Sequence, residues 1–258
     1  MESWRSYIVQ SSSHVKPMTT RESVAILLAI SLLGLLCFYG VRPVLEQMGW
    51  SAYRTYLVSL SIPFLVMLAW SGLAFLHEGN QRTWESFLRR IQLKRLTRSV
   101  AVWSTGLGLF MLASTLLFSP LISRAISRGL LPMPTAIPDY INPVKQLSVT
   151  QIGAQLASEG VVPLIPFVLV LNILGEEIFW RGMIFPRQEL TYGKRTFLVH
   201  GTIWALSHAF QYWLIPPILL SSLALAYVFQ RSKNTWIGIL GHAFNNGLPL
   251  AIIILVGL

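Results

Sequence analysis

The chain has few charged residues, one cysteine and one aspartate. Asp, Glu, Lys and Arg make up 12% of its 258 residues, whereas 53% are hydrophobic. With a mean hydropathy of +0.58, this composition lies outside the range of soluble domains and indicates a polytopic membrane protein. Cys37 alone cannot form an intrachain disulfide, and Asp139 alone excludes a pair of catalytic aspartates.

Negative charge is the scarcer sign, so the net charge is +10. Such a charge can indicate nucleic-acid binding, but in an apolar chain it more often reflects Lys and Arg retained on the cytoplasmic side of a bilayer. We therefore expect a lipid bilayer, and no nucleic acid, as a partner. The first apolar run lacks a convincing small-residue cleavage site, which argues against a cleaved signal peptide.

Seven apolar runs approach the length of about 20 residues that a membrane-spanning helix needs. They predict an all-α, polytopic membrane helix bundle of about seven transmembrane helices. With a cytoplasmic N-terminus, most of the 20 Lys and Arg residues lie inside, as the positive-inside rule requires. We expect a protein of the plasma (inner) membrane, with a cytoplasmic tail at residues 1–22 and a single membrane domain at residues 23–258. The predicted spans are residues 23–41, 56–77, 99–119, 161–180, 197–213, 215–230 and 236–257.

Two segments that connect predicted spans have patterns of their own. Residues 82–99, RTWESFLRRIQLKRLTRS, mix apolar with basic side chains. This favours an interfacial helix on anionic headgroups over a solvated basic loop. Residues 120–160 are interrupted by prolines and polar residues, so they predict an external loop with a short helix at about Val149–Ser158.

Polar and ionisable side chains within the predicted spans are concentrated toward the C-terminus. A charged side chain costs roughly 2.5 to 3.5 kcal/mol on membrane-insertion scales, so such residues indicate function, pairing or a water-filled cavity. They are Glu176, Glu177, Arg181, His208, His242 and Asn246.

Helical spacing separates the two glutamates. Glu177 and Arg181 are four residues apart in the favoured acid-before-base order, so we expect them to pair on one helix face. Glu176 points about 100° away, because a helix turns once every 3.6 residues. It is therefore left free for other partners.

The remaining polar residues lie on two further predicted helices. His242 and Asn246 are four residues apart and share a face, and Trp204 lies one turn before His208. Together with Glu176, they are the residue types that activate a water molecule and stabilise an oxyanion. Each histidine alone is more often a hydrogen-bonded packing residue, and Asn246 alone could cap or bridge helices.

Other ways of cutting a peptide bond in a membrane lack their residues. The nearest text to a zinc HExxH helix, HEGNQ at residues 77–81, lacks the second histidine. Ser71, in AWSGL, lacks the leading glycine of a rhomboid-type serine. Only the set of glutamate and histidine residues is left. The other histidines, His14, His77 and His200, are expected to be incidental.

Three ordered motifs resemble those of the CAAX-processing and bacteriocin-immunity family of glutamate-dependent intramembrane proteases, which includes the Rce1-type prenyl-protein endopeptidases. EEIFWR, residues 176–181, fits the family's EExxxR motif. WALSH, residues 204–208, is similar to FxxxH, with Trp in place of Phe as the aromatic wall. HAFNN, residues 242–246, matches HxxxN. The resemblance covers about residues 160–250, which would form the catalytic core.

The resemblance implies a role for each matched residue. Glu176 would be the general base for the attacking water, and His208 would help to hold that water. His242 and Asn246 would bind the oxyanion of the tetrahedral intermediate. The supporting residues would be Glu177, Arg181 and Trp204. This scheme implies no cofactor, and its partner would be a membrane-anchored or lipidated protein or peptide substrate.

Three alternatives remain open. Zinc could be held by Glu176, His208 and His242 with an open fourth position. A non-catalytic bacteriocin-immunity or scaffold protein could use the same pocket to bind a peptide. A proton-coupled transporter would be favoured by inverted repeats, which the sequence does not show.

Overall fold

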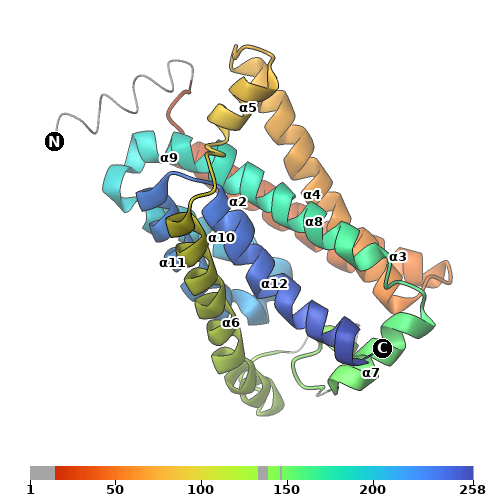
Figure 1. The fold of residues 1–258 in the computed structure, drawn as a ribbon. Helices are drawn as coiled ribbons and strands as arrows, with labels where there is room; N and C mark the ends of the chain where they lie inside the picture. The colour runs from red at the N-terminus through yellow and green to blue at the C-terminus, as the bar shows by residue number, and fades with distance from the viewer. Residues whose placement is uncertain (1–14, 133–138, 146, 258) are drawn as a thin grey trace.

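The computed structural model describes residues 15–132, 139–145 and 147–257 (Figure 1). Within these ranges every regular element is a helix, which confirms the expected all-α bundle. Those helices are α2 Thr20–Leu35, the π-helix η1 Leu36–Val41, α3 Arg42–Gln47, α4 Ala52–His77, α5 Trp84–Arg90, α6 Arg98–Ser127, the 3-10 helix η2 Asp139–Ile141, α7 Val149–Ser158, α8 Leu164–Glu176, the π-helix η3 Glu177–Ile184, α9 Phe185–Tyr192, the 3-10 helix η4 Gly193–Arg195, α10 Thr196–Leu206, the 3-10 helix η5 Ala209–Leu214, α11 Ile215–Ser232 and α12 Trp236–Gly257. Residues 1–14 of the expected tail, including His14, lie outside the described residues, as do residues 133–138 of the expected external loop.

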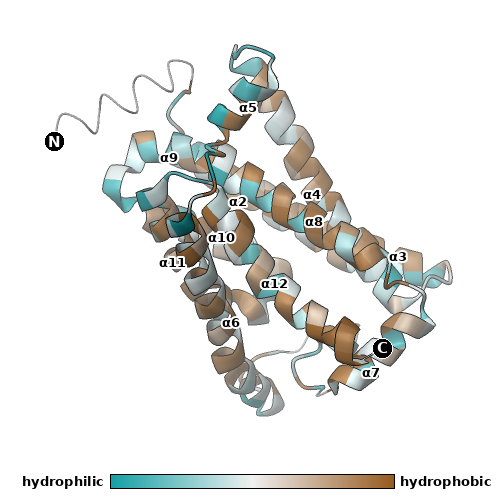
Figure 2. Ribbon diagram, viewed as in Figure 1, coloured by the Kyte–Doolittle hydropathy of each residue, from teal (hydrophilic) through white to brown (hydrophobic). Residues whose placement is uncertain are grey.

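Five helical segments of the described chain are long and apolar enough to cross a membrane, so the protein is an integral membrane protein. Each contains one predicted span, and they are Thr20–Gln47, Ala52–His77, Arg98–Ser127, Ala209–Ser232 and Trp236–Gly257. Hydrophobic residues follow α4, α6 and α12 along their length, while hydrophilic residues gather where α5 and α9 lie (Figure 2).

The other two of the seven predicted spans, residues 161–180 and 197–213, do not coincide with such a segment among the described residues. Within residues 161–180, α8 begins only at Leu164 and passes directly into η3, which carries Glu177 and Arg181. Residues 197–213 are not one helix, because a turn at residues 207–208 separates α10 from η5. The 11 residues of α10 extend only about 16 Å at 1.5 Å per residue, which is short of a bilayer core of about 30 Å.

Two helix pairs form the flanks of the bundle. α8 packs against α4 and α12 packs against α6 (Figure 1). Glycine permits both close approaches, as small residues do between membrane helices. A Cβ at Gly108 of α6 would lie 2.5 Å from the Cβ of Phe244, and a Cβ at Gly175 of α8 would lie 3.0 Å from the backbone oxygen of Phe64.

The π-helix η3 lies at the centre of the main apolar core. Phe179, Trp180 and Ile184 of η3 are buried there with side chains from at least five other helices. Those partners include Met67 of α4, Met111 of α6, Trp204 of α10, Leu225 of α11 and Ile237 of α12. The sequence that carries EExxxR is therefore held on several sides rather than at the lipid surface.

Two predicted connecting helices are present. α7 has the expected bounds Val149–Ser158, and a capping box between Ser148 and Gln151 fixes its start. Within residues 82–99 only α5 and the first residues of α6 are helical. Trp84 of α5 is 72% exposed, whereas Arg90 is 8% exposed. The basic side chains of this segment therefore do not all face outward.

Candidate active site

The site is built on a helix that changes its hydrogen-bonding pattern beside the two glutamates. α8 ends at Glu176 and continues directly into η3. The N–H of Phe185 donates to the carbonyl of Trp180, five residues earlier. Pro186 follows at once and has no N–H, so the carbonyl of Gly182 cannot receive the α-helical bond from four residues ahead. Such π-helical turns occur often at functional sites.

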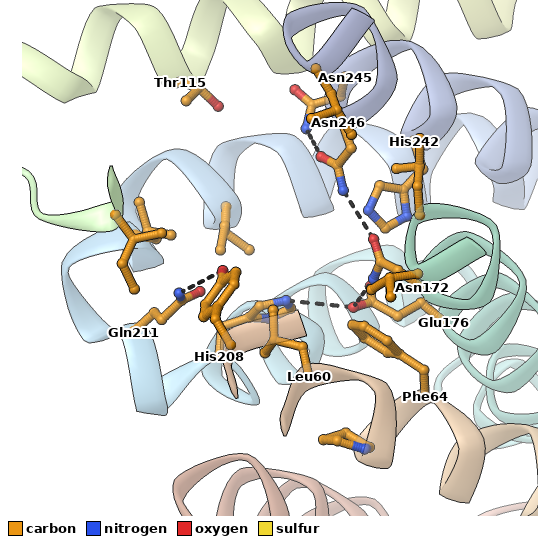
Figure 3. A pocket seen from close by; sticks show the side chains of 18 of the residues that line it. Leu60, Phe64, Thr115, Asn172, Glu176, His208, Gln211, His242, Asn245 and Asn246 are labelled. Carbon is orange, nitrogen blue, oxygen red and sulfur yellow. Dashed lines mark hydrogen bonds and ion pairs between the residues drawn. The ribbon is translucent and has the colours of Figure 1, made fainter. Parts of the chain in front are cut away.

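Glu176 lies on the cavity side of this helix and is 5% exposed. Its Oε2 accepts a hydrogen bond of 3.0 Å from Trp204 Nε1, and its Oε1 accepts one of 3.3 Å from Asn172 Nδ2. His208 Nε2 lies 3.8 Å from the same Oε1 (Figure 3). The carboxylate thus has two neutral donors, and no Lys or Arg forms an ion pair with it among the described residues.

His208 lies in the turn between α10 and η5. Its Nδ1 is 2.9 Å from the carbonyl oxygen of Trp204. A carbonyl only accepts hydrogen bonds, so Nδ1 carries the hydrogen, and in a neutral imidazole Nε2 then has the free lone pair. His208 Nε2 and Glu176 Oε1 are consequently two acceptors that face each other across 3.8 Å.

Glu177 lies on the other side of the helix and is fully buried. Its Oε1 is 3.2 Å from Arg181 Nη1 and 3.3 Å from His242 Nδ1, so the pairing expected from the i, i+4 spacing is present. A Cβ at Gly238 would lie 1.8 Å from Glu177 Oε2. Only glycine at that position of α12 leaves room for the carboxylate.

Trp204 separates the two carboxylates. Its Nε1 faces Glu176, while the Arg181 guanidinium carbon lies 3.9 Å from the centre of its ring. Such cation–π contacts are stronger when the cation is removed from water. The indole therefore contributes a hydrogen-bond donor as well as the aromatic wall that the sequence indicated.

An asparagine that sequence reasoning missed connects the remaining residues. Asn246 Nδ2 donates to Asn172 Oδ1 at 3.1 Å, and Asn172 donates onward to Glu176 (Figure 3). Asn245 Nδ2 in turn donates to Asn246 Oδ1 at 2.7 Å. Asn172 precedes Glu176 by four residues, and this spacing was the signal that could have identified it.

A cavity of about 570 Å³ opens beside these residues. Most of its wall is apolar and comes from α4, α6, α8 and α12. Glu176, His208, His242 and Asn246 line it, as do Asn172 and Trp204, whereas Glu177 and Arg181 do not. Four of the expected catalytic residues therefore line one largely apolar cavity.

The alternative zinc ligands are not gathered into one set. Among the residues that the structure describes, no three His, Cys, Asp or Glu side chains form a group that could hold a metal ion. His242 Nδ1 faces Glu177 rather than Glu176. His200, which was expected to be incidental, is fully buried, and its Nδ1 lies 2.7 Å from Gln188 Oε1.

Comparison with known families agrees with the three motifs. Residues 158–248 match the model of a family described as type II CAAX prenyl endopeptidase Rce1-like. Neither the curated proteins nor the solved structures gave a match. The family match confirms the resemblance over the segment that builds the site. It supports, in general terms, a CAAX-protease-like function within the membrane.

Proposed function

We propose that the protein is an intramembrane endopeptidase that hydrolyses a peptide bond of a membrane-anchored or lipidated protein through a water molecule activated by Glu176. The observation that carries this proposal is the pair of acceptors, Glu176 Oε1 and His208 Nε2, 3.8 Å apart at the cavity wall. A water molecule at a normal distance of about 2.8 Å from both atoms can donate one hydrogen to each. Its oxygen lone pairs then face the cavity.

Each step of the reaction has a residue in place. Glu176 takes a proton from the water as its oxygen adds to the carbonyl carbon of the substrate, and later returns that proton to the leaving amine nitrogen. Asn246, which lines the same cavity, donates a hydrogen bond to the oxyanion. His242, whose Nδ1–H is directed at Glu177, also donates from Nε2 when both of its ring nitrogens carry a hydrogen. Glu177 orients His242 through Nδ1, in the way that carboxylates orient functional histidines elsewhere.

The surroundings support a substrate that reaches the site from the bilayer. The apolar wall of the cavity suits an extended peptide with apolar side chains. Lys194, Arg195 and Arg231 lie at the ends of α9 and α11, and the positive-inside rule favours this end as cytoplasmic. We propose this orientation, with the N-terminus inside, for a protein of the plasma (inner) membrane.

The test is cleavage of a panel of membrane-anchored peptide reporters by the purified protein in lipid. Wild type should cut at least one reporter, and Glu176→Gln should lose most of this activity. Glu85→Gln is the matched control, since it removes a carboxylate that is 80% exposed on α5, and it should cut at the wild-type rate. His208→Ala should lose about 100-fold or more.

Three outcomes would overturn parts of this proposal. If a folded wild-type protein cuts no reporter but still binds one, the immunity or scaffold interpretation replaces it. If a chelator abolishes cleavage and zinc restores it, the ligand set Glu176, His208 and His242 replaces the metal-free scheme. If Glu176→Gln retains wild-type turnover, the general base is another residue.

A further inference from the structure

The carbonyl of Gly182 in η3 has no α-helical partner. In an α-helix it would accept from residue 186, but that residue is Pro186, which has no N–H. A buried carbonyl without a partner costs roughly as much as a lost hydrogen bond. The partner that the structure supplies comes from a distant part of the chain.

That partner is Arg90, the last residue of α5. Its Nη1 donates to Gly182 O at 2.7 Å, and its Nη2 lies 3.4 Å from Met183 O. Its Nε and Nη2 also donate to the two carboxylate oxygens of Glu78, at 2.5 and 2.7 Å. Arg90 therefore binds a carboxylate with one edge and the η3 backbone with the other, a geometry that a planar guanidinium allows and an ammonium does not.

The residues after Arg90 are hydrogen-bonded to the segment that precedes α12, the second helix of the site. Thr235 Oγ1 donates to Ile91 O, and Thr235 N donates to Gln92 O at 3.0 Å. Asn234 Nδ2 donates to Arg95 O at 3.0 Å. Asn234 and Thr235 immediately precede α12, the helix that carries Gly238 and His242. One short segment is thus bonded to η3 at one point and to the start of α12 at the next.

Close packing leaves little freedom between these contacts. A Cβ at Gly182 would lie 2.9 Å from the Cβ of Ile91, so η3 and residue 91 are in direct contact. Five residues before Gly182 in η3 and seven residues after Thr235 in α12, Glu177 Oε1 and His242 Nδ1 are 3.3 Å apart. A shift of η3 against α12 would alter this distance as well as the cavity face that presents Glu176.

We infer that Arg90, held by Glu78, is a positioning residue of the proposed protease. It donates to the Gly182 carbonyl, whose α-helical donor is absent because residue 186 is proline, and so fixes η3 against α12. It touches neither the cavity nor the reacting atoms. Its effect on turnover rests on the proposed function, whereas its effect on the backbone of η3 does not.

The experiment compares two neighbouring arginines of α5 in protein reconstituted into lipid. Arg90→Gln removes the buried guanidinium, and Arg89→Gln removes one that is 63% exposed and paired with Glu85. Arg90→Lys keeps the charge but cannot bind Glu78 and Gly182 O together. Backbone hydrogen exchange of residues 177–184 is measured first, because it needs no substrate. It should accelerate about tenfold or more in Arg90→Gln, less in Arg90→Lys, and not in Arg89→Gln.

Reporter cleavage then shows whether this positioning matters for catalysis. A misplacement of about 1 Å can cost about 100-fold in rate, so Arg90→Gln should lower kcat by about that factor with little change in KM. In a Glu177→Gln background the same substitution should cost much less, because both changes act through the contact with His242. Arg89→Gln should leave kcat and KM unchanged.

The outcomes separate the inference from the proposed function. If exchange in η3 accelerates but wild type cuts nothing, the proposed function fails and the role of Arg90 in η3 stands. If wild type is active and Arg90→Gln changes neither exchange nor kcat, the inference is overturned. It is also overturned if the losses of Arg90→Gln and Glu177→Gln simply multiply. Should Arg90→Gln fail to fold, Arg90→Lys and Glu78→Gln carry the same comparison.

Discussion

Two neighbouring glutamates on opposite sides of one helix have contrasting environments. On the cavity side, Glu176 accepts hydrogen bonds from neutral groups and faces an open chamber. On the packed side, Glu177 has Arg181 as its counter-ion and no access to the cavity. A base must keep a basic lone pair available, whereas a buried structural carboxylate is tolerated only when it is paired. The difference therefore supports the proposal that Glu176 is the base and Glu177 a supporting residue.

The largest expected effect comes from breaking the ion pair on the packed side. Glu177→Gln should destabilise the fold by about 3–5 kcal/mol, because it leaves the Arg181 guanidinium buried without its counter-ion. Glu177→Gln combined with Arg181→Met should recover part of that loss, since no unpaired charge is left. The free energy of unfolding of both variants is measured in detergent by titration with denaturant.

The surface pair Glu85 and Arg89 is the control for this prediction. Both side chains are more than half exposed, so Glu85→Gln should cost less than about 1 kcal/mol. If Glu177→Gln is no more costly than Glu85→Gln, the packed side does not depend on charge pairing and the contrast between the two glutamates fails.

A smaller effect is expected from filling the space beside Glu177. Gly238→Ala would place a methyl carbon 1.8 Å from Glu177 Oε2, so the carboxylate or α12 must move. Overpacking of this kind costs about 1–3 kcal/mol, and it should also reduce turnover by shifting His242. Thermal unfolding and reporter cleavage measure the two consequences.

Gly106→Ala provides the matched control within a neighbouring helix. A Cβ at Gly106 of α6 meets no atom within 4 Å, and alanine is favoured over glycine in a helix by about 0.5–1 kcal/mol. Stability should stay the same or rise. If Gly238→Ala and Gly106→Ala have the same stability and the same rate of reporter cleavage, Glu177 can move away from α12 without cost.

Sequence reasoning found the polar residues that lie together at the cavity more readily than the helices that hold them. Polar residues within apolar runs are rare enough to stand out, and i, i+4 spacing brought Glu177 to Arg181 as expected. The same apolar composition concealed the break at residues 207–208, because the apolar residues on both sides of Ser207 and His208 read as one continuous span. The predicted span 197–213 was therefore too long.

Long-range contacts account for most of what the sequence could not show. Arg89 and Arg90 are identical in type and adjacent, yet only Arg90 is buried, against a carbonyl 92 residues away. Pro186 was a visible signal for a disturbed helix, but whether a proline produces a kink or a π-helix depends on what satisfies the freed carbonyl. The need for glycine at position 238 likewise depends on Glu177, which lies on another helix.

The smallest expected effect concerns the residue between the two sides. Trp204→Phe keeps a ring for Arg181 but removes the Nε1 donor to Glu176. Phe stands at this place in the FxxxH motif that WALSH resembles, so we expect kcat to fall only about tenfold, near the lower end of the cost of a hydrogen bond to a charged group. Trp180→Phe is the control, because Trp180 is fully buried and its Nε1 has no hydrogen-bond partner among the described residues. Reporter cleavage at saturating substrate should be unchanged in that variant. If kcat instead falls 1000-fold in Trp204→Phe, the indole N–H is as important to Glu176 on the cavity side as Arg181 is to Glu177 on the packed side.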